Sequence, residues 1–301
     1  MQSLGNKLAQ VEMLAKLSKL RRLLHHPMKY VLAVGYRTIV YPWIKKGMPV
    51  KATTFFDSEM HLMLPAATDI YLTGGKADPS EIRLAKFMIQ NLSEAACFFD
   101  VGAHFGYYTL LAVKLVGESG VVCSFEPSST NFKLLQQNAA SKRNIHLYNA
   151  AVSDTTEELL FYEFPVLFSE FNTTDIDQFE EEAWLSKYQP EIKKVSSIVL
   201  DQLIEERRYK PSMIKIDVEG GELNVINGLV NYIAANNCVL IMEYLSEARK
   251  NEPHQKAVTL LQQSGFTAFA ITEDGSVKKL DDVNAYVASL QSESENIVFK
   301  K

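Results

Sequence analysis

The sequence predicts an α/β fold in which a mostly parallel sheet is covered by helices on both faces. Short apolar runs of strand length alternate with helical stretches between residues 96 and 300, the pattern of a doubly wound parallel sheet. The first apolar run breaks at Asp100 and is followed by Gly102 and Gly106, and the second ends at Glu126. Acids and glycines at strand ends are typical of sheets that bind a ligand at their carboxyl edge.

The predicted elements follow in chain order. An extended segment, Thr53 to Leu64, comes before a helix that opens at Asp78-Pro79-Ser80-Glu81, where the proline and the acid favour helix initiation. Seven strands are predicted, at 96–101, 121–126, 145–152, 212–218, 238–244, 266–272 and 296–300. Helices are predicted at 107–116, 128–140, 222–235 and 253–264. We expect Leu159 to Tyr162 to form a hairpin partner of the strand at 145–152.

Residues 164–194 interrupt the alternation with a segment rich in acids and aromatic side chains. A long insertion within a compact domain is typically functional or mobile. We predict that it covers the substrate pocket, where its aromatic side chains could stack on a sugar ring or cover an apolar chain: Phe168, Phe171, Trp184 and Tyr188.

The turn after the first strand predicts the class of cofactor. A dinucleotide site needs three glycines in the pattern G-x-G-x-x-G, whereas here His104 separates Gly102 from Gly106 and the third glycine is missing. Asp100 would repel a phosphate but attract the amino group of an amino acid. Glu126 lies about 20 residues beyond the last glycine, where a carboxylate meets ribose hydroxyls. These features favour S-adenosylmethionine over a nicotinamide cofactor, and a turn without any ligand is the alternative.

Five motifs in order resemble those of the FkbM-type S-adenosylmethionine-dependent methyltransferases. They are Phe99 to Leu110, Phe125 to Phe132, Ala150 to Asp154, Val199 to Asp201, and the D-V-E-G-x-E element within Ile214 to Glu222. His104 stands where this family more often has Asn. The resemblance implies a Rossmann-like class I methyltransferase fold and O-methylation of a hydroxyl on a sugar, glycolipid or polyketide.

The loop chemistry and the resemblance together give a set of expected cofactor-binding residues. They are Asp100, Gly102, Ala103, His104, Gly106, Tyr108, Thr109, Glu126, Pro127, Asn131, Ala151, Val152 and Asp217.

Three acids at or just beyond the ends of later strands are the predicted catalytic residues: Asp217, Glu219 and Glu243. Transfer of a methyl group to a hydroxyl needs in-line placement and a base. We expect Asp217 and Glu219 to orient the acceptor and remove its proton, with Glu243 in support. Repulsion between two neighbouring carboxylates raises the pKa of at least one of them, or the pair recruits a divalent cation. We assign no metal ligand from the sequence.

Other roles for nearby residues stay open. Glu219 could instead be an acid that favours the start of the next helix, and Glu222 is expected to be one. His104 and His254 are further candidate bases. A protein that keeps the fold without catalysis, associated with a membrane, is the alternative function.

The N-terminal residues differ in charge from the rest of the chain. Residues 1–51 contain ten Lys or Arg and one acid, net +9, while the remainder is net −14. Met13, Leu17, Leu20 and Leu24 recur at helical spacing within this basic region. A basic amphipathic helix favours the surface of an anionic membrane. The alternative is that this stripe packs on the catalytic domain.

Composition restricts the compartment and the partners. The three cysteines show neither zinc spacing nor a disulfide framework, which favours a reducing compartment. We expect a cytoplasmic protein that can contact the inner face of the membrane, with a small-molecule, glycan or glycolipid acceptor. The acidic catalytic region makes nucleic acid an unsuitable partner. The expected organisation is a helical extension over 1–52 and a methyltransferase domain over 53–301.

Overall fold

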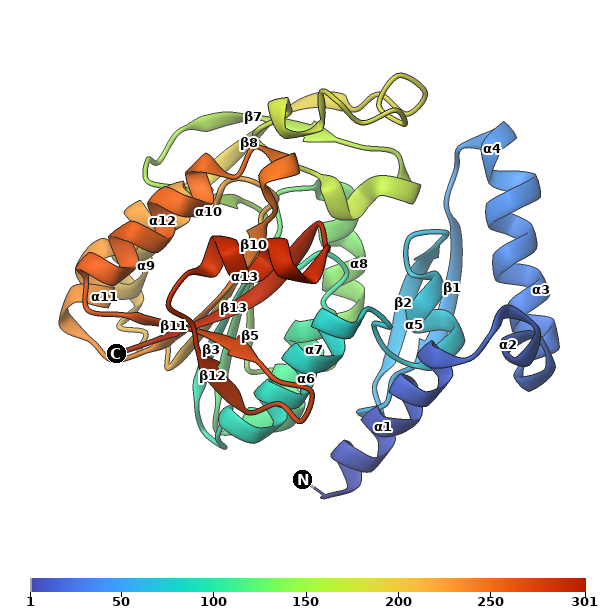
Figure 1. Cartoon of the computed structure of the whole chain (residues 1–301), viewed down its shortest axis with the longest axis horizontal. Coiled ribbons are helices and arrows are strands. Elements are labelled where there is room, and N and C mark those ends of the chain that lie inside the picture. The colour runs from blue at the N-terminus through green and yellow to red at the C-terminus, as the bar shows by residue number, and fades with distance from the viewer. Residues whose placement is uncertain (1) are drawn as a thin grey trace.

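The computed structural model describes residues 2–301 and contains an eight-stranded sheet with helices on both faces (Figure 1). Its strand order is β12-β11-β13-β10-β9-β3-β4-β5. The bounds are β3 Cys97–Val101, β4 Val121–Phe125, β5 Ile145–Tyr148, β9 Met213–Ile216, β10 Val239–Leu245, β11 Thr267–Ile271, β12 Val277–Lys279 and β13 Ser294–Lys300. The seven predicted strands all have counterparts here, and β12 is an added edge strand.

The central strands run parallel, and the end of the sheet does not. β5, β4, β3, β9 and β10 pair in parallel. β13 lies antiparallel between β10 and β11, and β12 pairs antiparallel with β11. The carboxyl ends of the parallel strands therefore meet at one edge, and the predicted fold class is confirmed.

Alternate strand residues serve two separate cores, because successive side chains in a strand point to opposite faces. Phe98 packs with α6 (Pro79–Asn91) and α7 (Tyr107–Val116), whereas Phe99 packs on the other face. The helices of that second face are α9 Leu200–Arg207, α10 Glu222–Asn227, α11 Val230–Ala235, α12 Glu252–Gln263 and α13 Val283–Leu290. Helix α8 (Ser129–Ala139) contributes Leu134 to the first core. The sheet is thus buried on both sides, which explains its apolar strands.

Two predicted elements are broken in the structure. The strand at 145–152 divides into β5 and β6 (Ala151–Val152), and the helix at 222–235 divides into α10 and α11. The break comes at Gly228, where the chain passes so close to the Ser153 carbonyl oxygen that an added Cβ would lie 2.2 Å from it. Asp201 then accepts hydrogen bonds from the first turn of α11, at Asn231 N and Tyr232 N.

The hairpin prediction was wrong about the partner strand. β7 (Glu158–Glu163) pairs with β8 (Glu191–Ile198), and β8 also pairs with β6, giving a small sheet of order β6-β8-β7. The sequence analysis did not predict β8 because its sequence is polar, and most of its side chains are exposed or half-buried. The insertion therefore ends in a strand, and its irregular part contains two short 3₁₀ turns, Val166–Phe171 and Asp177–Phe179.

The N-terminal extension is a chain of short helices, followed by a hairpin and one more helix. The bounds are α1 Gln2–Lys16, α2 Lys19–His25, α3 Pro27–Gly35, the π-helical turn η1 Tyr36–Val40, α4 Tyr41–Ile44, β1 Met48–Thr53, β2 Glu59–Leu64 and α5 Thr68–Thr73. Helix α1 packs into the first core through Leu4, Leu8 and Val11. The predicted apolar stripe is instead divided between α1 and α2, and its Leu20 and Leu24 are 65% and 73% exposed. Within residues 2–301, no helix has the length and apolarity needed to cross a membrane.

Candidate functional site

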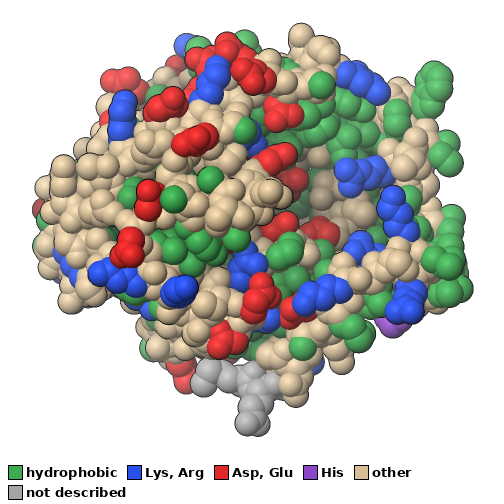
Figure 2. All heavy atoms as spheres, in the orientation of Figure 1, with side chains coloured by type: hydrophobic (Ala, Val, Ile, Leu, Met, Phe, Trp, Pro, Cys, Tyr) green, Lys and Arg blue, Asp and Glu red, His purple; other side chains and the backbone are tan. Residues whose placement is uncertain are grey.

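A cavity of about 560 Å³ opens at the carboxyl ends of the parallel strands. One wall comes from the turns after β3 and β4, and the opposite wall from residues 66–81 and the insertion. Figure 2 shows a central hollow with acidic side chains on its walls. This size is within the range of small-molecule sites, so the cavity is the candidate active site.

The two predicted glycines serve different purposes. Gly102 has φ +80°, and a Cβ there would lie 1.7 Å from the Asp217 carbonyl oxygen. This glycine therefore allows the chain after β9 to pass close to the turn after β3. At Gly106, with φ +88°, a Cβ would lie 2.6 Å from Leu135 Cδ1, so this glycine allows α7 to pack on α8. The positive φ by itself also favours glycine at this second position.

The clash at Gly102 predicts a large loss of stability for Gly102→Ala. A left-handed non-glycine residue costs about 1–3 kcal/mol, and overpacking adds about 1–3 kcal/mol. Gly265→Ala is the matched control, because Gly265 has φ +87° and no atom within 4 Å of the added Cβ. Urea unfolding should show Gly102→Ala losing at least about 1 kcal/mol more than the control. Equal losses would contradict the steric argument.

Ten of the thirteen expected cofactor-binding residues line the cavity: Gly102, Ala103, His104, Tyr108, Glu126, Pro127, Asn131, Ala151, Val152 and Asp217. Asp100, Gly106 and Thr109 lie behind its wall. Thr109 Oγ1 donates to Asp100 Oδ2 at 2.6 Å, and both side chains are buried between β3 and α7. Asp100 is thus displaced from the expected contact with an amino group, and Asp217 is the acid that reaches the cavity there.

Glu126 lines the cavity and already braces the turn after β3. It accepts hydrogen bonds from His104 N at 2.8 Å, Ser128 N at 2.9 Å and Asn131 Nδ2 at 3.4 Å. Burial raises the pKa of Glu126 to about 7. A carboxylate has about four acceptor positions, so this side chain can accept one further hydrogen bond from a ligand.

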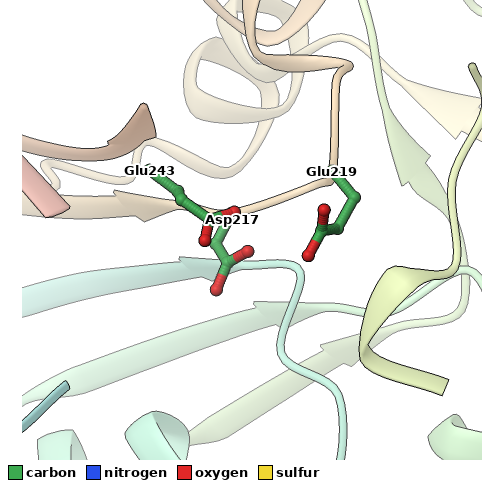
Figure 3. A group of neighbouring side chains, drawn as sticks. All are labelled: Asp217, Glu219 and Glu243. Carbon is green, nitrogen blue, oxygen red and sulfur yellow. The ribbon is translucent and has the colours of Figure 1, made fainter. Parts of the chain in front are cut away.

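The three predicted catalytic acids come together in the structure. Carboxylate oxygens of Asp217, Glu219 and Glu243 lie within 4.8 Å of one another. Figure 3 shows Asp217 and Glu243 side by side, with Glu219 facing them from the loop after β9. Oxygens this close can share a proton or a divalent cation. Lys215 and Arg249 already place positive charge beside two of them, which favours the ionised form of these two carboxylates and makes a further cation less favourable.

The three carboxyl groups differ in their protonation. Burial acts to raise the pKa of Asp217, but the Lys215 ammonium at 2.8 Å outweighs it and holds this pKa at about 2. Burial and the Asp217 carboxylate raise the pKa of Glu243 well above its usual range. Glu243 Oε2 is buried and has no hydrogen-bond partner within the described residues. The surroundings of Asp217 therefore favour its ionised form, while those of Glu243 favour its protonated form.

Glu219 is held in an unusual conformation by groups distant in sequence. Its φ is +53°, and its carbonyl oxygen accepts from Thr173 Oγ1 at 2.5 Å and from Gln178 Nε2. Arg249 Nη2 donates to Glu219 Oε2 at 3.1 Å and to Gln178 Oε1 at 2.9 Å. The Arg249 guanidinium also lies 4.4 Å from the centre of the Phe179 ring. Arg249 thereby joins Glu219 to the insertion.

The surroundings of the other candidate acids and bases indicate what each of them does. Glu222 begins α10 and is fully buried, and it accepts hydrogen bonds from Val218 N and Gly220 N, so it braces the loop that carries Glu219. His254 Nε2 lies 2.9 Å from Glu222, behind the cavity. His104 lines the cavity, and burial together with the Lys76 charge lowers its pKa to about 3. His104 is therefore neutral at physiological pH.

Several cavity residues escaped the sequence prediction. Lys76 lies 3.0 Å from Glu81 Oε2, and Lys215 lies over the Tyr108 ring. Burial raises the pKa of Glu170, in the insertion, to about 7. Lys215 could have been found from the sequence, because a lysine is unusual inside an apolar strand such as Met213–Ile216. Lys76 and Glu81 come before all the motifs, and no sequence signal pointed to them as site residues.

Comparison with known proteins identifies one family. The profile described as "Methyltransferase FkbM domain" matches residues 100–268. Curated proteins give no match.

Solved structures resemble the chain at low identity. An FkbM methyltransferase from Methylobacillus flagellatus KT is 13% identical over 78% of this chain and 53% of its own, with a TM-score of 0.45. An O-methyltransferase from Bacillus cereus, in complex with SAH, is 12% identical over 72% and 78%, with a TM-score of 0.41. A fibrillarin from Aeropyrum pernix with natively bound S-adenosyl-L-methionine is 8% identical over 73% and 74%, with a TM-score of 0.40.

Proposed function

The chain belongs to the methyltransferase FkbM domain family, and on that premise we propose that it methylates a hydroxyl of a sugar, glycolipid or polyketide. Membership makes it an S-adenosylmethionine-dependent methyltransferase. The observation that supports the proposal is a cavity with Glu126 on one wall and the cluster Asp217, Glu219 and Glu243 on another.

The residues around Glu126 fit the cofactor. Glu126 has acceptor capacity left for a ribose hydroxyl, Asn131 offers an amide, and Phe125 and Val152 supply apolar surface for a base. Asp217, ionised and on the cavity wall, suits the cationic part of the cofactor. When bound, S-adenosylmethionine supplies a methyl group on a positively charged sulfur.

Proton removal from the acceptor falls to Glu219 in this proposal. Burial raises the pKa of Glu219 well above its usual range, and the Arg249 charge opposes that rise. A positive charge brought into the cavity favours the ionised form of Glu219 further, and an ionised carboxylate there can accept a hydroxyl proton. In this proposal Asp217 orients the acceptor, and the protonated form of Glu243, which its surroundings favour, donates a hydrogen bond within the cluster.

The aromatic part of the insertion contributes less to the pocket than the sequence suggested. Phe171 lines the cavity. Phe168 and Trp184 instead stack on each other, with ring centres 4.2 Å apart, and Tyr188 packs against Phe168. In this proposal Phe171 alone of the four meets the acceptor, and the other three stiffen the segment that carries it.

Cofactor choice can be tested by thermal unfolding with S-adenosylmethionine and with NAD. A ligand at 100 times its dissociation constant adds about 2.7 kcal/mol of stability. S-adenosylmethionine should raise the melting temperature, and NAD should not. Stabilisation by NAD alone would overturn the proposal.

Loss of the Glu126 carboxylate should weaken cofactor binding. Glu126→Ala leaves a hydroxyl of the ligand and the backbone N–H of His104 without their hydrogen-bond acceptor, which costs about 1–3 kcal/mol. Affinity should therefore fall about 5- to 150-fold by calorimetry. Glu158→Ala, an exposed acid on β7, is the control and should bind normally. Unchanged affinity in Glu126→Ala would remove this residue from the cofactor site.

The proposal also covers location. Residues 1–52 would hold the enzyme at an anionic membrane surface on the cytoplasmic side, where glycolipid acceptors are accessible. The supporting observation is the +9 charge of residues 1–51.

A further inference from the structure

Exposed apolar side chains concentrate in one part of the molecule. Of the thirteen large apolar side chains that are exposed within the described residues, ten lie in the N-terminal extension. They are Met13, Leu20, Leu24, Met28, Val31, Leu32, Ile39, Val40, Trp43 and Ile44. Contiguous apolar surface of this kind marks a site of interaction with a membrane or another molecule.

This surface is a fixed, one-sided feature of α3, η1 and α4. Met28 and Trp43 are 86% and 87% exposed, whereas Ala33 and Tyr41 on the same run of helices are fully buried. Tyr41 Oη accepts a hydrogen bond from Leu167 N at 2.9 Å, which ties α4 to the insertion. The outward face is therefore held in place by contacts on the inward face.

Positive charge accompanies the apolar side chains. Figure 2 shows Lys and Arg among hydrophobic side chains along the edge that Figure 1 assigns to α2, α3 and α4. The exposed bases on these elements and the turn after them are Lys19, Arg21, Arg37, Lys45 and Lys46. The single acid of residues 1–51, Glu12, is paired with Lys16 and Lys86.

Exposed apolar side chains together with positive charge favour a lipid surface over the other possible binding partners. A second copy docked on this face would bring two strongly positive surfaces together, which is unfavourable. Nucleic acid would match the charge but would leave the apolar side chains in water. Anionic lipid matches both, because the headgroups attract Lys and Arg while Trp43 and its apolar neighbours enter the interface.

The lipid-facing segment also forms part of the cavity wall. Arg37, on the π-helical turn η1, lines the cavity, and the outward Ile39 follows two residues later. The same short segment thus touches both the proposed bilayer and the space where the acceptor enters. A molecule anchored in that bilayer would present its polar head beside Arg37.

We propose that α2, α3, η1 and α4 lie in the headgroup layer of an anionic membrane, and that the methyl acceptor is a lipid-anchored molecule whose polar head enters the cavity beside Arg37. The second half of this proposal rests on the proposed function, because it assigns the acceptor of the same reaction. The first half stands on the exposed surface alone.

Vesicle sedimentation tests the membrane contact. The full chain should bind phosphatidylcholine vesicles that contain about 30% phosphatidylglycerol, and added salt should weaken the binding. The double variant Ile39→Glu, Trp43→Glu should lose binding at least about tenfold. Its matched control is Leu160→Glu, Ile192→Glu, which alters two exposed apolar residues of β7 and β8. The proposal is overturned if the wild-type chain stays in the supernatant, or if the control variant loses binding as strongly as the double variant. A dimer in solution that the double variant abolishes would also overturn it.

Methyl labelling tests the acceptor. Wild-type protein with methyl-labelled S-adenosylmethionine should label the organic-phase lipids of its host cells, reconstituted in the same vesicles, rather than the aqueous extract. The double variant should bind S-adenosylmethionine normally by calorimetry and lose this labelling. Label confined to the aqueous extract would overturn the lipid-anchored acceptor while leaving the methyltransferase proposal intact. No label in either extract, despite vesicle and cofactor binding, would overturn both acceptor proposals.

Discussion

Replacing Glu219 by glutamine is expected to lower turnover about 10²- to 10⁴-fold, the usual contribution of a general base. The amide keeps the shape of the side chain and can still accept a hydrogen bond from Arg249, but it accepts no proton. Affinity for S-adenosylmethionine should change little, because the cofactor contacts of the proposal come from Glu126, Asn131 and Asp217 rather than from Glu219. Steady-state kinetics with calorimetry on the same variant would check both parts.

The control for this variant is a second acid joined to the same region. Glu180 lies on the insertion and pairs with Lys250 at 2.6 Å, next to Arg249 in sequence but on the surface. Glu180→Gln should leave turnover within about twofold of wild type, since an exposed ion pair contributes about 0–1 kcal/mol. If Glu219→Gln instead loses cofactor affinity as strongly as turnover, Glu219 is a cofactor ligand rather than the base.

The parallel sheet could be predicted because its strands are buried on both faces. Strands such as Cys97–Val101 and Val239–Leu245 are almost continuously apolar, so their existence follows from local sequence. β8 was missed because its polar side chains, most of them exposed or half-buried, carry no such pattern. The close approach of Gly228 to the Ser153 carbonyl joins segments far apart in sequence, so a helical pattern alone could not reveal it.

The part of the site that lies at the ends of strands could be predicted from the sequence. Asp217 and Glu219 follow β9 and Glu243 lies near the end of β10, and the parallel pairing of these two strands brings the three acids together. Lys76 and Arg249 reach the cavity region from segments outside the recognised motifs, so only the folded chain reveals them. For Asp100 the position at the end of β3 could be predicted, but not the hydrogen bond that its side chain accepts from Thr109.

Arg249 is the residue through which the insertion and Glu219 are joined, and its removal should affect both. Arg249→Met leaves the Glu219 carboxylate and Gln178 Oε1 without their shared donor. Breaking a buried ion pair by removing one partner costs about 3–5 kcal/mol. We therefore expect a lower free energy of unfolding in urea, and turnover reduced by one to two orders of magnitude in the fraction that stays folded (about 1.4 kcal/mol per factor of ten).

The pH profile separates positioning from mere stability. Burial raises the pKa of Glu219, and the Arg249 charge lowers it. A base must be ionised, so turnover rises with pH through this pKa, and removing the Arg249 charge should move that rise to higher pH. Arg249→Lys keeps the charge but not the two-acceptor geometry, so it should fold better than Arg249→Met, with a smaller shift of the profile and reduced turnover. If Arg249→Met lost stability while its turnover profile coincided with that of wild type, Arg249 would hold the insertion without acting on Glu219, and the assignment of Glu219 as the base would lose its structural support.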